Sequence, residues 1–237
     1  MKKTLAKGMA LAFVGSLFVA GSALALPWDS LSSDYIVSTN MDYWTVTDLT
    51  TNVTGTSLYT LVVEQATYES NFGLYTIDSG GNLAATFEIF ARTDEPSTFP
   101  ATQKTVTFWY DSGVYKVTKS FSDDNDFSND NWTAFDDVFG FYYEVYNPNA
   151  YLHTFYTDSN LNTADVGIEH ITTAYDPNNK NTYIFLEDLL AANADWDWTD
   201  MTVHANDVEP IPEPATMLLM GTGLAGLAGV ARRRKKA

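Results

Sequence analysis

Short runs rich in Val, Ile, Thr, Tyr and Phe fill the middle of this sequence, and clusters of Gly, Pro, Asn and Asp separate them. Several runs alternate polar and apolar residues, as TVTF at 105–108 and YKVT at 115–118 do, which is typical of half-buried strands. No segment between the two ends has a long helical period, although 187–194 could form one helical turn. The pattern predicts an all-β fold, an antiparallel β-sandwich of jelly-roll type. The expected strands are 58–64, 72–77, 84–91, 105–110, 114–119, 138–146, 151–157, 168–174, 182–187 and 201–205.

The N-terminal end is typical of a secretory signal peptide. Three lysines within the first seven residues precede an apolar stretch at 9–20. Ala23 and Ala25 then supply small side chains at the two positions that signal peptidase reads. We therefore expect export and a mature chain that begins near Leu26.

The C-terminal end is typical of a membrane anchor. Residues 215–231 carry no charge, and this stretch is close to the lower limit for a transmembrane helix, which needs about 20 residues. The basic cluster from Arg232 to Lys236 follows directly, and such clusters stay on the cytoplasmic side. The pattern predicts an exported domain that one C-terminal transmembrane helix holds, at least temporarily, in the inner membrane.

The order of these C-terminal features resembles the PEP-CTERM sorting signal of Gram-negative bacteria. The residues that carry the resemblance are the motif Pro212, Glu213 and Pro214, the apolar stretch, and the arginines Arg232, Arg233 and Arg234. The resemblance implies that the membrane enzyme exosortase processes the tail and releases or transfers the protein to the cell surface or extracellular matrix. It also implies a bacterium that makes exopolysaccharide. An ordinary tail-anchored protein is the alternative.

The chain thus divides into a signal peptide (1–25), an acidic β-sandwich domain (26–211) and a sorting tail (212–237). Eight of the 13 basic residues lie in the two ends, but only one of the 30 acidic residues does, so the domain has 5 basic and 29 acidic residues and a formal charge of −24. This charge argues against nucleic acid as a partner, and its self-repulsion favours bound cations, for which calcium is the extracellular candidate. Because the chain has no cysteine, disulfides, thiol catalysis and thiolate zinc sites are excluded.

The densest acidic pattern lies at 187–200, where Asp195, Asp197 and Asp200 follow one another within six residues. Calcium prefers six to eight hard oxygen ligands from an acidic loop. We expect strand-like alternation to place Asp195 and Asp197 on one side and Trp196 and Trp198 on the other. The predicted calcium site consists of these three aspartates with Glu187, Asp188 and Asp165. The alternative is a solvated acidic loop that the two tryptophans anchor.

A second acidic pattern precedes it. Asp158, Asn160, Asn162 and Glu169 partly match the ligand spacing of an EF-hand loop, but Thr163 occupies the position that needs glycine. We therefore expect a calcium-binding loop of another geometry, with Asp158, Asn162 and Glu169 as ligands. The acidic residues at 123–137 are expected to form a solvated loop, and another calcium site is the alternative.

The two patterns together resemble a secreted β domain of unknown function that often precedes PEP-CTERM tails. The matching residues are FGLY at 72–75, FYTDS at 155–159, LN at 161–162, EH at 169–170, EDL at 187–189 and DWDWTD at 195–200. The resemblance covers about residues 70–208 and implies an association with calcium.

The leading hypothesis is a non-enzymatic, calcium-stabilised surface or matrix protein associated with exopolysaccharide. One alternative is a carbohydrate-binding module with a platform of tryptophans, namely Trp28, Trp44, Trp132, Trp196 and Trp198. Another is a carbohydrate-active hydrolase, which would need two carboxyls across a sugar cleft. His153, His170 and His204 follow no zinc motif, and serine-hydrolase, P-loop and dinucleotide motifs are absent from the sequence.

Overall fold

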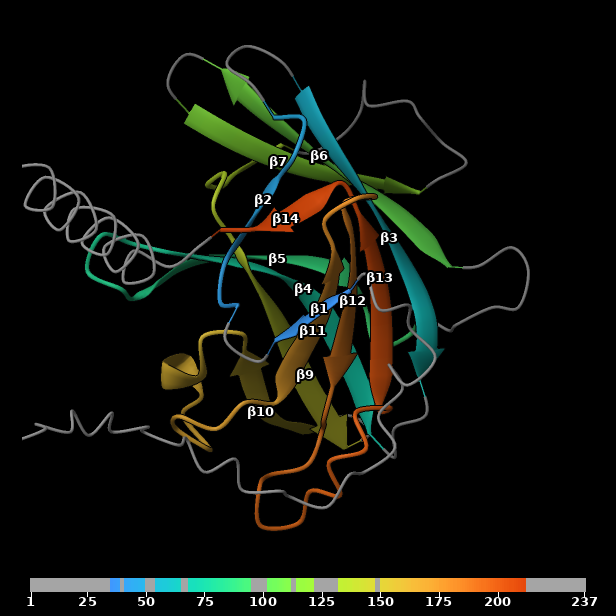
Figure 1. Cartoon of the computed structure of the whole chain (residues 1–237). Coiled ribbons are helices and arrows are strands. Elements are labelled where there is room, and N and C mark those ends of the chain that lie inside the picture. Colours follow the sequence, from blue (N-terminus) through green and yellow to red (C-terminus); the bar gives the residue numbers. More distant parts are fainter. Residues whose placement is uncertain are drawn as a thin grey trace, which may run out of the picture.

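The computed structural model describes residues 35–38, 41–49, 54–64, 68–94, 102–111, 114–121, 132–147 and 150–211. Within these residues the protein is all-β, and every strand pair is antiparallel (Figure 1). The predicted fold class and strand direction are therefore confirmed.

The described residues of the domain form three sheets. The largest has the order β1 (Ile36–Ser38), β11 (Ile171–Asp176), β12 (Asn181–Leu186), β13 (Met201–Asn206), β3 (Thr54–Glu64), β6 (Gln103–Asp111), β7 (Val114–Phe121) and β8 (Thr133–Ala134). The second has the order β10 (Ala150–Tyr156), β9 (Gly140–Asn147), β4 (Glu69–Ile77) and β5 (Leu83–Phe90). A small third sheet pairs β14 (Val208–Pro210) with β2 (Trp44–Val46), and one 3-10 turn, η3, spans Ser159–Leu161.

Each of the ten predicted runs overlaps one strand of this fold. The strands that the ten runs do not cover are β1, β2, β8 and β14, each of which has two or three residues. The jelly-roll connection pattern is not confirmed, because most neighbours in the two larger sheets are consecutive strands joined as hairpins. The expected helical turn is a single hydrogen-bonded turn, in which the carbonyl of Leu190 accepts from the backbone N–H groups of Asn193 and Ala194.

The core lies between the two larger sheets. Alternate residues of the eight-stranded sheet point inward and pack against alternate residues of the four-stranded sheet, as the two-residue period of a strand requires. The first sheet contributes Tyr59, Leu61, Val106, Phe108, Ile184 and Val203, and the second contributes Phe72, Leu74, Phe141, Tyr143 and Phe155. Trp44 of the small sheet is fully buried with its ring 4.6 Å from that of Phe141, so the third sheet closes one side of the core.

The signal peptide and the sorting tail both lie outside the part of the chain that the structure describes. The predicted cleavage site at 23–25 and the expected transmembrane helix at 215–231 therefore lie outside the described residues as well. Among the residues that are described, no helix has the length and apolar character needed to cross a membrane.

Candidate metal centre

The hairpin of β12 and β13 determines where the acidic residues of 187–200 lie. Leu186, the last residue of β12, is paired with Met201, the first residue of β13. The chain leaves the sheet immediately after Leu186 and returns immediately before Met201. Glu187 and Asp188 at one end of the loop are therefore brought next to Asp200 at the other end.

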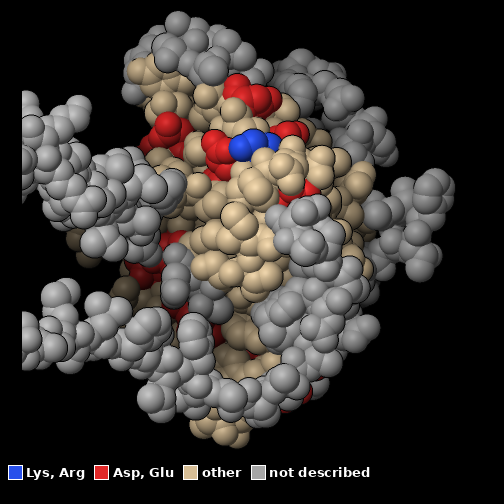
Figure 2. All heavy atoms as spheres, in the orientation of Figure 1, with Lys and Arg blue, Asp and Glu red and all other residues tan. Residues whose placement is uncertain are grey.

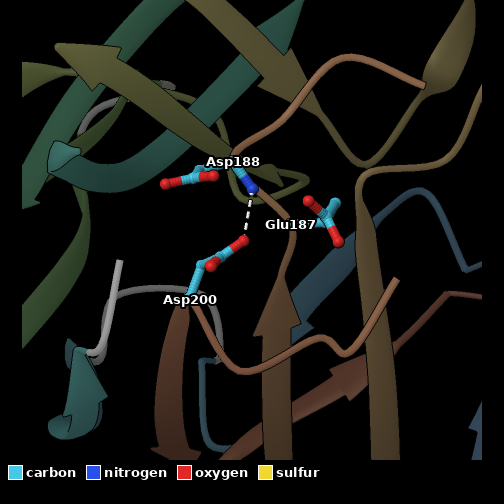
Figure 3. Close-up of side chains that lie close together, drawn as sticks. All are labelled: Glu187, Asp188 and Asp200. Carbon is cyan, nitrogen blue, oxygen red and sulfur yellow. Dashed lines mark hydrogen bonds between the residues drawn. The ribbon is translucent and has the colours of Figure 1, made fainter. Parts of the chain in front are cut away.

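These three carboxylates form a compact cluster, shown in Figure 3. One oxygen atom from each of Glu187, Asp188 and Asp200 lies within 4.8 Å of the other two. The backbone N–H of Asp188 donates to Oδ2 of Asp200 at 2.7 Å (the dashed line in Figure 3). Glu187 and Asp188 are 0% and 2% exposed and Asp200 is partly exposed, so two of the three carboxylates are buried.

Backbone donors orient Glu187. Its Oε1 accepts from the N–H of Leu189 at 3.2 Å, and its Oε2 accepts from the N–H of Trp196 at 2.8 Å. Asp188 is less well satisfied, because its Oδ2 atom is buried and makes no hydrogen bond to any described residue. A buried carboxylate oxygen without a donor costs free energy unless a cation or a proton compensates it.

The electrostatics of the cluster are those of crowded negative charges. Burial, reinforced by the charges of Asp200 and Asp195, raises the pKa of Glu187 from 4.5 to about 7. Burial and Asp200 likewise raise the pKa of Asp188 from 3.8 to about 7. The pKa of Asp200 is raised mainly by burial and also by Asp197 and Asp195.

Basic side chains that could relieve this repulsion are engaged elsewhere. Four of the five basic residues of the domain make ion pairs with other carboxylates: Arg92 with Glu69, Lys104 with Asp94, Lys119 with Glu88, and Lys180 with Glu209. Acidic side chains gather around a small basic patch on the face shown in Figure 2, in agreement with the large negative charge of the domain. Lys116, the fifth basic residue, lies over the ring of Trp109. Protons or a bound cation would relieve the repulsion within the cluster.

The donor set indicates which cation fits. All the side-chain donors of the cluster are carboxylate oxygens, which suit hard cations such as Ca²⁺ and Mg²⁺ better than zinc or copper. Calcium takes six to eight oxygens and accepts irregular geometry, whereas magnesium requires a near-ideal octahedron. Glu187, Asp188 and Asp200 would hold such an ion, and Oδ2 of Asp188 would gain a partner.

Asp195 and Asp197 are placed differently from the prediction. Asp195 acts as a neighbouring charge, and Oδ1 of Asp197 accepts from the N–H and hydroxyl of Thr199 at 2.9 and 2.8 Å. Trp196 and Trp198 have left-handed φ values of 58° and 59°, so the segment is a coiled loop without the expected strand-like alternation. Asp197 therefore caps a turn next to the cluster, while the cluster itself forms from both ends of the loop.

The upstream acidic residues have partners of their own. Oδ2 of Asp165 contacts Nε2 of His170 at 3.1 Å and accepts from the N–H of Ala191 at 2.7 Å, which braces the loop. Asp158 caps η3 through the N–H of Asn160 and accepts from the hydroxyl of Tyr43. These contacts are structural, and they place neither residue in the three-carboxylate cluster.

Asn162 and Glu169 are the remaining predicted ligands. Asn162 is fully buried, and its amide bridges two backbone groups: Oδ1 accepts from the N–H of Tyr156 at 2.7 Å, and Nδ2 donates to the carbonyl of Ile168 at 2.8 Å. Burial raises the pKa of Glu169, whose Oε2 is buried without a hydrogen bond to a described residue. Neither residue belongs to the three-carboxylate cluster.

The histidines and tryptophans are mainly packing residues. His170 is 0% exposed and stacks on Phe155 with ring centroids 3.7 Å apart, and burial lowers its pKa. Trp44 and Trp198 are 0% and 9% exposed, so they cannot serve in a sugar-binding platform. The rings of Trp132 and Trp196 pack against Trp109 and Trp198 respectively, and Trp28 lies outside the described residues.

Comparison with known proteins identifies the tail. Residues 210–235 match the PEP-CTERM protein-sorting motif. The match includes only the last two residues of the β domain, so the resemblance of residues 70–208 to a secreted β domain is not confirmed. No curated protein and no solved structure shows significant similarity to the chain. The sorting motif supports an exported protein that is sorted at the membrane and processed by exosortase.

Proposed function

We propose that this chain is a non-enzymatic protein of the cell surface or extracellular matrix of a Gram-negative bacterium, stabilised by calcium and associated with exopolysaccharide. Exosortase processing of the tail would deliver it there after signal peptidase has removed residues 1–25. The observation that supports the calcium part is the cluster of Glu187, Asp188 and Asp200, in which the buried Oδ2 of Asp188 has no hydrogen-bond partner among the described residues.

A calcium ion at this position would stabilise the domain in two ways. It would cancel repulsion among carboxylates whose pKa values are raised toward neutrality. It would also tie the loop at 187–200 to the end of the eight-stranded sheet. That loop contains two bulky residues with left-handed backbone, Trp196 and Trp198, each of which costs about 1–3 kcal/mol. Ion binding would offset that cost, so the loop and the ion are expected to stabilise each other.

Thermal unfolding of the mature, tail-processed protein tests the calcium proposal. A ligand that binds only the folded state contributes about 2.7 kcal/mol at 100 times its dissociation constant. For a domain of this size that corresponds to a rise in Tm of about 5–11 °C over the chelated protein. Magnesium should give a much smaller rise because it loses its water ligands reluctantly.

Two matched variants make the test specific. Asp200→Asn removes one charge from the cluster but keeps an oxygen that can accept from Asp188, and it should abolish most of the calcium shift. Asp207→Asn also removes one charge, in the turn between β13 and β14, where the left-handed φ of 59° suits asparagine. This control should keep the full shift. Equal melting of the native protein in calcium and in chelator would overturn the proposal.

Burial favours a structural role for the cluster over hydrolysis. A glycosidase must bring two carboxyl groups into contact with its substrate, but Glu187 and Asp188 are 0% and 2% exposed. A polysaccharide chain cannot reach them in this conformation. The release of reducing sugar from the host exopolysaccharide, lost in Glu187→Gln, would contradict the non-enzymatic proposal.

A further inference from the structure

The surface of the domain also has a groove, and none of the three cluster residues lines it. An open groove of about 500 Å³ runs between the end of the β4–β5 hairpin and the segment of β7 and β8. β8 is an edge strand of the eight-stranded sheet and β5 is an edge strand of the four-stranded sheet. The groove therefore lies where these two edges of the sandwich meet. Its volume falls within the range of roughly 300–1,000 Å³ that is usual for small-molecule sites.

One part of the groove is apolar. Ile77, Ala84, Ala85, Val114 and Phe135 line it. Phe135 is only 7% exposed and belongs to the core, whereas Val114 is 48% exposed. These two alanines and Ala134, which also lines the groove, keep it open, because larger side chains at these positions would occupy part of it. The apolar lining is therefore accessible and continuous with the core.

The other part of the groove is polar and acidic. Tyr115, Asp78 and Asp136 line it, and none of its lining residues is Lys or Arg. Asp78 is held in its own turn, where Oδ1 accepts from the N–H groups of Gly80 and Asn82 at 2.8 and 2.9 Å, and these bonds lower its pKa. Asp78 is therefore a fixed negative charge and a poor general acid. Oδ1 of Asp136 accepts from the N–H of Asp137, and its remaining lone pairs can accept from a ligand.

We propose that this groove binds an uncharged sugar unit of a polysaccharide, a proposal that rests on the proposed association with exopolysaccharide. A sugar ring combines an apolar C–H face with hydroxyl donors, which matches a groove that has an apolar side and a carboxylate side. The C–H face would lie on Val114, Ala84 and Ala85, and the hydroxyls would donate to Asp136 and contact Tyr115. Sugars that carry carboxylate or sulfate groups would be repelled by Asp78 and Asp136.

Binding to the mature, tail-processed protein in calcium buffer tests this site. The probes are two tetrasaccharides without negative charge, cellotetraose and chitotetraose, and tetragalacturonate as the anionic counterpart, each measured by saturation-transfer NMR and by calorimetry. We expect at least one uncharged tetrasaccharide to bind at millimolar concentration or below and tetragalacturonate to bind at least tenfold more weakly.

Two groove variants and one control locate the binding. Ala84 is exposed, so Ala84→Trp fills the groove without disturbing the core and should weaken binding at least tenfold. Asp136→Asn keeps an acceptor for the N–H of Asp137 but removes the charge, and it should weaken binding severalfold. Asp207→Asn, outside the groove, should bind as the native protein does. Failure of both uncharged probes to bind, undiminished binding by Ala84→Trp, or equal binding of tetragalacturonate would overturn the proposal.

The same samples separate this proposal from the proposed function. Melting in calcium and in chelator is measured on each variant beside sugar binding. If sugar binding is absent while the calcium shift is intact, the groove proposal is wrong and the calcium proposal stands. If the calcium shift is absent while sugar binding is intact, the groove proposal is confirmed and the calcium site is rejected.

Discussion

Tyr75 in β4 lies directly opposite Gly140 in β9, and its ring covers the glycine. A Cβ atom on Gly140 would lie 2.3 Å from Cε1 of Tyr75. Two residues away in the same ladder, Gly73 lies opposite Tyr142, and a Cβ there would lie 2.7 Å from a ring carbon of Tyr142. Each of the two strands thus contributes one aromatic ring that covers a glycine of the other strand. These two contacts help to fix the register between β4 and β9, the central pair of the four-stranded sheet.

The same tyrosine connects the sheet to the loop at 157–162. The hydroxyl of Tyr75 accepts from the N–H of Asp158 at 3.0 Å and lies 3.3 Å from Oγ1 of Thr157. The absence of a side chain at Gly140 therefore leaves room for the ring that holds the backbone of Asp158, the residue that caps η3.

Gly140→Ala should destabilise the domain by about 1–3 kcal/mol, because the added methyl group must displace the ring of Tyr75. Urea denaturation followed by tryptophan fluorescence measures the change. In a Tyr75→Leu background the alanine has room, so its additional cost should be much smaller. A cost of Gly140→Ala that is the same in both backgrounds would contradict the steric explanation.

Without calcium, the Tm of the domain should fall as the pH rises from 6.5 to 8. The pKa values of Glu187 and Asp188 are raised to about 7, so the folded state keeps protons that the unfolded chain has already released. Stability therefore decreases as the pH rises through the folded pKa values. Buried His170 and His204 have lowered pKa values and act in the opposite direction, an effect that fades as the pH rises above 6.5 and unfolded histidine loses its proton. Differential scanning calorimetry in metal-free buffer measures the effect.

Calcium and the variant Glu187→Gln provide the controls for this pH dependence. Calcium should abolish most of the fall, because a bound cation takes over the role of the protons. Glu187→Gln in metal-free buffer should show a shallower fall than the native protein, since one of the titrating groups is gone. A native Tm that rises between pH 6.5 and 8 would show that these carboxyls are not perturbed in the proposed direction.

Residue patterns predicted most of the sheet but not its shortest strands or its connections. Alternation over four or more residues marks a strand, so β3 to β7 and β9 to β13 could be recognised. A strand of two or three residues such as β8 has no measurable period and exists only because a neighbour pairs with it. The jelly-roll prediction depends on the number and close spacing of the strands, which do not specify the order of strands in a sheet.

The candidate site shows a related limit. The predicted calcium site is centred on the dense acidic run at 195–200, but the three carboxylates that lie together come from the two ends of the loop. Their signal was present in the sequence, because acidic residues lie at the end of one predicted strand, 182–187, and directly before another, 201–205. Assuming that these strands form a hairpin would have placed Glu187 and Asp188 near Asp200. The groove at Asp136 had no such signal, since it depends on how the edges of two sheets meet.

Asn162→Ala should destabilise the fold while leaving the calcium shift unchanged. The change removes both hydrogen bonds of the buried amide and leaves the N–H of Tyr156 and the carbonyl of Ile168 unpaired. Each unpaired group costs about 1–3 kcal/mol. The Tm should therefore fall in calcium and in chelator by similar amounts. A variant that keeps its stability in chelator but loses the calcium shift would instead identify Asn162 as a metal ligand.

Replacing Pro212, Glu213 and Pro214 together with alanine should block processing of the tail without blocking export. These residues lie within the segment, 210–235, that matches the sorting motif, whereas export depends on the separate signal at 1–25. The native protein recovered from the cell surface should lack its apolar stretch and the arginines at 232–234, as intact-mass measurement would show. The triple variant should remain in the membrane fraction at the mass of residues 26–237, and N-terminal sequencing should still begin near Leu26. Retention of the whole tail by the native surface protein would reduce the segment to a plain anchor, and loss of N-terminal cleavage in the variant would mean that the two signals are not independent.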